Sequence, residues 1–301
     1  ELLKRYEAGE RDFCGVALPM RDFSKQNLQT ADLRKSSLQG GNFSDSHLVE
    51  VNFQDAFLVE VNFQNANLHG ANFQRATLRG ANFQGAKLLE TRLREADLQG
   101  ANLRETSALM AGQLGGANLC GAKLPDEIKN FDGLKSVEEI SKHAGNLFFS
   151  LLLACVYAWL TIGTTTDALL LTNSASSPLP IVGAAVPIVA FYLAAPLFLL
   201  VLYIYLHLNL QRLWEALADL PAIFPDGRSL DKKAHPWLLN GLVCAYFPRL
   251  RASRPPLSRL QVGISAFVAW WLGPLTVLLF WGRYLRRHDW VGTILLVALL
   301  T

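Results

Sequence analysis

The chain has 301 residues with 28 basic and 25 acidic side chains, so its net charge of +3 indicates no preference for nucleic acid or for an acidic partner. Its four cysteines have no metal-ligand spacing, and it contains no nucleophile elbow, HExxH motif or Gly-rich phosphate loop. We therefore expect no metal, no cofactor and no enzymatic activity.

A five-residue word repeats through residues 11–125. Its centre is a bulky apolar residue that recurs at every fifth position from Phe13 to Leu103, usually with Ala two places earlier and often with Asn or Asp one place earlier. A helix has a period of about 3.6 residues and a strand a period of about 2, so neither explains a period of five. Each word must instead turn the chain by a fixed angle, so that the centres point inward and stack on the next turn.

One extra residue interrupts this period near residues 106–108. The next apolar centre is Leu109, and the period then resumes at Leu114, Leu119 and Leu124. We expect Leu109 to point inward like the other centres.

These words resemble the pentapeptide-repeat family, whose formula is A(N/D)LXX. The resemblance implies a right-handed quadrilateral β-helix with four words per coil, and hence about six coils that stack about 4.8 Å apart. Side chains twenty positions apart then share one wall of the β-helix. We expect its core to contain Phe23, Phe43, Phe53, Phe63, Phe73, Phe83, Leu48, Leu68, Leu78 and Leu88.

Some relatives in that family are acidic dimers that mimic DNA. Residues 1–125 contain 14 basic and 14 acidic side chains, so they lack the dense negative surface that mimicry needs. They also lack the basic stripe that binds nucleic acid. We expect no nucleic-acid partner.

Long apolar runs begin after the repeats. A linker helix over 126–145, with a capping box at Ser136, leads into a transmembrane domain over 146–301. Three spans and the start of a fourth are predicted from apolar runs, most of them long enough to cross a bilayer, at about 147–171, 181–208, 262–281 and 291–301. The predicted fold class is therefore an N-terminal β-helix (1–125) followed by an α-helical transmembrane domain.

Basic residues predict the orientation of the spans. The segment 209–261 contains eight Lys and Arg residues and the loop 164–180 contains none, which places that segment and the repeats in the cytoplasm. Arg283, Arg286 and Arg287 would then face outward, where they could snorkel or lie in a short hairpin. The layout resembles bacterial membrane proteins that join pentapeptide repeats to several spans, and we expect a multi-pass protein of the bacterial inner membrane.

Polar residues and prolines near the spans are candidates for a membrane function. Asp167 lies either just outside the bilayer or in an ion path, and the prolines kink the second span either as a gate or for packing. The candidates are Asp167, Pro187, Pro196 and His207.

The cytoplasmic segment contains a further amphipathic pattern. Residues 236–250 have apolar side chains at helical spacing, which favours equally an interfacial helix on anionic lipid and a core helix of a small cytosolic insert. The loop 225–237 mixes charges with Pro and Gly and is typical of a solvated turn. The candidate lipid contacts are Arg249, Arg251, Arg254 and Arg259.

Two functions of different classes remain. The first is a membrane-anchored scaffold or sensor whose β-helix binds a cytosolic protein, with the lipid bilayer as its other partner and with homo-oligomers allowed. The alternative is an oligomeric pore or membrane-perturbing effector in which the β-helix senses or assembles. The repeat array favours the first directly.

Overall fold

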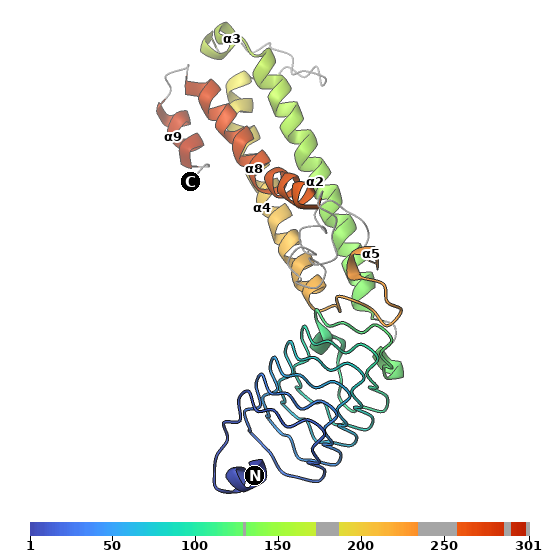
Figure 1. The fold of residues 1–301 in the computed structure, drawn as a ribbon. Coiled ribbons are helices and arrows are strands. Elements are labelled where there is room, and N and C mark those ends of the chain that lie inside the picture. The colour runs from blue at the N-terminus through green and yellow to red at the C-terminus, as the bar shows by residue number, and fades with distance from the viewer. Residues whose placement is uncertain (129–130, 173–186, 234–257, 286–289, 299–301) are drawn as a thin grey trace. The chain divides into compact units, whose positions relative to one another are not determined.

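The computed structural model describes residues 1–128, 131–172, 187–233, 258–285 and 290–298. The chain forms two compact units (Figure 1). The repeat unit contains Glu1–Glu138 and returns at Glu215–Pro236, and the helical unit contains Glu139–Trp214 and Arg254–Thr301. This division differs from the expected one, because a segment that follows the second apolar helix packs with the repeats.

The words of the repeat unit wind into a four-sided coil after a short helix, α1 (Leu2–Glu7). Parallel β-bridges join residues twenty positions apart, as between Asn42 and Asn62. Backbone hydrogen bonds flank each bridge: Phe43 N donates to Asn62 O at 2.7 Å, and Asn62 N donates to Gly41 O at 3.0 Å. Each coil therefore contains four words, and this part of the chain has the pentapeptide-repeat fold, a quadrilateral β-helix.

Two columns of phenylalanine rings fill the axis of the β-helix. Phe63 stacks between Phe43 and Phe83, with ring centroids 5.4 and 5.1 Å apart, and Phe53 stacks on Phe73 at 4.9 Å. Rings of the two columns meet edge to face. These side chains are buried, as are the leucines of the other two walls from Leu28 to Leu98. Each buried ring contributes about 1.5–3 kcal/mol through apolar burial.

The corners of the coil explain the polar positions of the word. The side chain before the centre accepts a hydrogen bond from the backbone two residues later, as from Gln54 N to Asn52 Oδ1 at 3.2 Å. The last residue of most words has a positive φ, which favours glycine. Many words nevertheless end in a charged or branched residue, such as Glu60 at φ 55 and Thr30 at φ 59. The interstrand hydrogen bonds therefore outweigh the cost of this backbone conformation.

The extra residue near 106–108 is accommodated by a break in the wall. Leu109 is only partly buried, and a 3-10 helix, η1 (Ala111–Leu114), replaces a regular word. The amide of Gln113 donates to Leu88 O at 2.9 Å and to Thr91 O at 2.8 Å, in place of the missing backbone donors. Leu109 is therefore less buried than most of the regular centres, and its inward direction stays a prediction.

A segment that follows the second apolar helix adds a word to the end of the array. Ala222 and Phe224 lie in line with Ala117 and Leu119, as the small residue and the centre of a word. Leu119 N donates to Ile223 O, and Ala222 N donates to Ala117 O, both at 2.9 Å. Ala222 and Phe224 are fully buried. We call Leu220–Leu230 the cap segment.

A hairpin completes the cap segment. Ile223 pairs antiparallel with Ser229, and Leu230 N donates to Ala222 O at 2.9 Å. The helix α5 (Leu230–Lys233) follows, and η2 (Asp126–Ile128) lies after the last word of the array. Residues 225–228 do form a turn, but the segment around them is part of the β-helix rather than a separate cytoplasmic loop.

The helical unit consists of long apolar helices with polar contacts between them. Among the described residues, three helices are long and apolar enough to cross a membrane: α2 (Gly133–Thr164), α4 (Ile188–Ala218) and α8 (Ser258–Tyr284). The indole of Trp159 donates to Thr276 Oγ1 at 3.0 Å, joining α2 to α8. Tyr203 packs so closely on Gly273 that a Cβ at that glycine would lie 2.8 Å from its ring, which fixes the approach of α4 to α8.

The first predicted span, 147–171, is divided in two. The helix α2 ends at Thr164, and α3 (Asp167–Thr172) begins after a short break. The hydroxyls of Thr164 and Thr165 bond to backbone carbonyls four residues earlier, at 2.9 and 2.6 Å. Such back-bonding competes with the helical backbone pattern and accounts for the break. The last described helix, α9 (Trp290–Ala298), falls in the fourth apolar run.

Truncation of the stacked ring Phe63 tests the axial columns. Phe63→Ala should lower the free energy of unfolding of the repeat unit by about 3–5 kcal/mol, because it leaves a cavity between two rings. Hydrogen–deuterium exchange of the full chain in detergent should show faster exchange in the adjoining coils. Phe57→Ala, at a side chain that is 43% exposed, is the control and should change stability by less than about 0.5 kcal/mol. Equal effects of the two substitutions would contradict the stacking.

Truncation of Phe224 tests the cap segment. Phe224→Ala should speed exchange of the amides of Leu119 and Gly121 about tenfold or more, because these amides donate to the cap segment. Coils at the other end should be unaffected, since each coil contacts only its neighbours. Lys232→Ala, at an exposed position of α5, is the control. Unchanged exchange at Leu119 would show that the cap segment does not close the array.

Candidate functional site

One wall of the β-helix carries few charges in its first three coils. In the words centred on Leu18, Leu38 and Leu58, Glu60 is the one charged side chain, whereas two of the other walls carry several charged side chains in the same coils. We call this surface the Phe57 face, and it consists of Ala17, Pro19, Met20, Ser37, Gln39, Gly40, Phe57 and Val59.

Phe57 occupies a word position that holds Asn or Asp in many of the other words. It supplies no side-chain bond to the corner, and its ring is 43% exposed, so it contributes neither to the corner nor to the core. Met20 is 78% exposed and lies across Gly40, where an added Cβ would meet its sulfur at 2.2 Å. Exposed apolar patches of this kind mark interaction surfaces.

The neighbouring wall is polar, but its polar groups are largely satisfied within the wall. Asn62 Nδ2 donates to Asn42 Oδ1 at 3.2 Å, and the bond repeats at Asn82 and Asn102. Each of these Oδ1 atoms also accepts a backbone N–H. The column therefore stiffens the wall and offers a partner few free hydrogen-bonding groups.

Asp167 lies at the first residue of α3 and pairs with a basic residue at the end of α8. Arg283 Nη1 donates to Asp167 Oδ1, and Arg283 Nη2 donates to Thr165 O. The pair lies at one end of the helical unit. Asp167 is therefore a local counter-ion for Arg283. Arg286 and Arg287 lie outside the described residues.

The two prolines of the second span differ in position. Pro187 precedes α4, and its carbonyl accepts a hydrogen bond from Phe191 N at 3.2 Å, so it lies at the helix start, where a missing N–H costs little. Residues 181–186 lie outside the described residues, so a kink of the predicted span at Pro187 stays a prediction. Pro196 lies inside α4, and Pro274, which sequence analysis did not single out, lies inside α8.

His207 lies in an aromatic cluster of the helical unit. Its Nδ1 is 2.9 Å from Tyr203 O, and its ring contacts Tyr203 and Trp270 at centroid distances of 4.1 and 5.6 Å. Its Nε2 is buried without a hydrogen-bond partner among the described residues. The cluster is continued by Trp214, which stacks on Trp270.

The side chains of the candidate lipid contacts lie outside the described part of the structure. Arg249, Arg251 and Arg254 and the predicted amphipathic helix over 236–250 lie outside the described residues, and of Arg259 only the backbone, in the first turn of α8, is described. Within the part of the chain that the structure covers, no group of three His, Cys, Asp or Glu side chains is arranged to hold a metal.

Comparison with known proteins identifies the repeats. The family model for pentapeptide repeats (8 copies) matches residues 27–65, 46–85 and 73–107. HetL, a pentapeptide repeat protein involved in heterocyst differentiation regulation from the cyanobacterium Nostoc sp. strain PCC 7120, is 29% identical over 42% of this chain, with a TM-score of 0.28. That match covers 55% of HetL, so this chain spans about half of its length.

Two further solved structures match the same part of the chain. Rfr23 from the cyanobacterium Cyanothece 51142 is 28% identical over 42% of this chain and 93% of its own, with a TM-score of 0.25. A pentapeptide repeat protein from the Arabidopsis thaliana thylakoid lumen is 29% identical over 39% and 74%, also with a TM-score of 0.25. No curated protein matches the chain. Residues 27–107 are pentapeptide repeats, and three helices of the described part of the same chain are long and apolar enough to cross a membrane.

Proposed function

We propose that this protein is a membrane-anchored scaffold or sensor whose β-helix binds a partner protein through the Phe57 face. The observation that carries the proposal is the exposed ring of Phe57, on a surface of three coils in which Glu60 is the one charged side chain. Aromatic side chains and Met are enriched at the centres of protein interfaces, and charged side chains are depleted there. Pentapeptide-repeat proteins are generally structural or interaction proteins rather than enzymes.

The size of the Phe57 face limits its role to the centre of an interface. A stable interface buries about 800 Å² on each partner, whereas three coils stacked about 4.8 Å apart offer one narrow wall. The partner must therefore extend beyond this wall, with Phe57 and Met20 as its apolar anchors. A few such anchors carry most of the binding free energy of an interface.

The membrane anchor is supported by the surface of the helical unit. Large apolar side chains of the long helices are exposed, with fractions of 63% at Phe149, 70% at Leu153 and 60% at Phe198. Such a surface is unfavourable in water and suits hydrocarbon. We place the repeats in the cytoplasm, on the bacterial inner membrane, because the segment 209–261 has eight basic residues against none in 164–180.

Replacement of Phe57 tests the proposed face. Phe57→Ser should reduce capture of the partner by the purified full chain at least about tenfold. Loss of an aromatic side chain at the centre of an interface lowers the binding free energy by about 2 kcal/mol or more. Leu89→Ser is the matched control, since Leu89 is 45% exposed on a different wall. Quantitative mass spectrometry of the proteins retained from a detergent extract measures the difference.

Two results would contradict this proposal. The first is that Phe57→Ser and the wild type retain the same proteins. The second is reproducible unit conductance of the purified chain in planar bilayers, which would favour the pore instead.

Labelling of Cys14 tests the orientation. Cys14 is exposed, so a chain with Ser at positions 120, 155 and 244 has one accessible thiol in the repeat unit. A membrane-impermeant maleimide should label it only after the cells are permeabilised. Thr172→Cys in the same background, at an exposed position of α3, should be labelled in intact cells. Labelling of Cys14 in intact cells would reverse the assigned orientation.

A further inference from the structure

A proline divides the helix α8 into two parts. Pro274 lies inside the helix and has no backbone N–H, so the carbonyl of Trp270, four residues earlier, has no donor within the helix. A proline in the interior of a helix bends it at the preceding turn. Figure 1 shows the first turns of α8 at an angle to the rest of the helix. We call residues 270–274 the hinge.

A side chain of another helix supplies the missing donor. The hydroxyl of Tyr203, in α4, donates to Trp270 O at 3.1 Å. The hydrocarbon core of a bilayer offers no water to such a carbonyl, so the bond removes an unfavourable unpaired acceptor. The hydroxyl of Tyr203 thus takes the place of the amide that Pro274 lacks.

Two contacts position the ring of Tyr203 for this bond. The first is with Gly273, where an added Cβ would lie 2.8 Å from the ring. The second is with His207, whose ring centroid is 4.1 Å from that of Tyr203. Any side chain at position 273 would therefore displace the ring and move its hydroxyl away from the carbonyl of the hinge.

The part of α8 after the hinge is firmly packed. Val277, Phe280 and Tyr284 are at most 5% exposed. Just before them, Thr276 accepts a hydrogen bond from the indole of Trp159, in α2, at 3.0 Å. These contacts fix this part of the helix within the helical unit.

The part before the hinge, residues 258–269, is packed less firmly, and we call it the arm. Its large side chains Leu260, Ile264 and Phe267 are each more than half exposed. Among the side chains of the arm that the structure describes, the buried ones are Ser265 and Ala269, both small. Burial of large side chains therefore stops at the hinge, and less apolar contact opposes a change in the direction of the arm.

We propose that the arm rotates about the hinge between two orientations, and that the hydroxyl of Tyr203 is a latch that holds one of them. When the bond is broken, the hinge has one hydrogen bond fewer than a regular helix and bends more easily. Hydrogen bonds between helices in a bilayer are weak on average, so the latch can open and close reversibly. It is a conformational device of the helical unit and is independent of the Phe57 face.

Pulsed electron double resonance on the full chain in nanodiscs measures the orientation of the arm. One spin label is placed at Leu153→Cys in α2 and the other at Ile264→Cys in the arm, both at exposed positions. The native cysteines at positions 14, 120 and 244 are replaced by Ser, and Cys155 is retained because it is fully buried.

Tyr203→Phe removes the latch and should increase the fraction of the distance distribution outside the wild-type peak about threefold or more, which is the average strength of such a bond in a bilayer. The matched control is Tyr205→Phe, because the hydroxyl of Tyr205, in the same helix, lies 3.4 Å from His143 Nε2 of α2. It should leave the distribution unchanged. With the second label at Leu278→Cys, after the hinge, Tyr203→Phe should also have no effect.

Restoring the missing amide separates the latch from ordinary packing. Pro274→Ala supplies an N–H for Trp270 O, so adding Tyr203→Phe to this variant should not change the distribution further. Where Pro274→Ala does not fold, Gly273→Ala serves instead. It should reproduce the effect of Tyr203→Phe, and combining the two should add nothing. The proposal is overturned if Tyr203→Phe behaves like Tyr205→Phe, or if its effect persists in full in the Pro274→Ala or Gly273→Ala variant.

Discussion

Each coil of the repeat unit is buried and hydrogen-bonded only by the coils on either side of it. The five-residue word has no hydrophobic interior of its own, and its backbone donors point along the axis to residues one coil away. Stability therefore accumulates from contacts between neighbours, and the two ends of the column are its weak points. The chain covers them with segments outside the regular array. At the N-terminal end, α1 buries Leu2, and Tyr6 Oη donates to Gln29 O at 3.0 Å. At the other end lies the cap segment.

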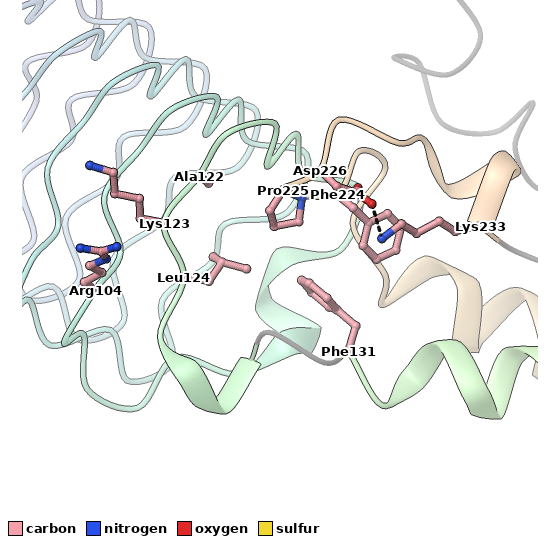
Figure 2. Close-up of a pocket in the computed structure, with 9 residues that line it drawn as sticks. All are labelled: Arg104, Ala122, Lys123, Leu124, Phe131, Phe224, Pro225, Asp226 and Lys233. Carbon is pink, nitrogen blue, oxygen red and sulfur yellow. Dashed lines mark ion pairs between the residues drawn. The ribbon is translucent and has the colours of Figure 1, made fainter.

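The cap segment shapes one end of the β-helix. It closes the column with a word of the right shape, and Phe224 from this word lines a cavity of about 410 Å³ at the same end (Figure 2). The Phe57 face lies in the first coils, away from the cap segment in the array, and the cap segment contributes no residue to it. The Phe57 face and the end that the cap segment closes are therefore separate parts of the β-helix.

Much of the repeat unit was predictable from the sequence, because the core positions are repeated many times. The period of five identified the inward residues, and the pattern of Asn and Asp indicated the corners. The left-handed last position was not predictable, since Glu60 and Thr30 stand where glycine would be expected. The insertion near Leu109 gave no signal for the turn of 3-10 helix that follows it. The added word at Ala222–Asp226 occurs only once and lacks the usual Asn or Asp, so the pattern did not reveal it.

The candidate sites were less accessible to sequence analysis than the core. A signal for the Phe57 face was present, namely an aromatic residue in a polar position of the word, but its meaning depends on which neighbours share its wall. The pairing of Asp167 with Arg283 and the hydrogen bond from Tyr203 to the carbonyl of Trp270 join residues far apart in the chain. No local pattern contains such information.

The late position of the cap segment in the chain has a consequence for biosynthesis. The last regular word leaves the ribosome roughly a hundred residues before Phe224 does, an interval of about 5–20 s at ordinary rates of translation. Throughout that interval the nascent column has an unclosed end, with unpaired backbone donors at Gly116, Leu119 and Gly121. Two of the long apolar helices, α2 and α4, are synthesised in the meantime. Completion of the β-helix therefore waits for the synthesis of α2 and α4. A nascent chain that stalls before α4 has an exposed edge on which another such chain can stack.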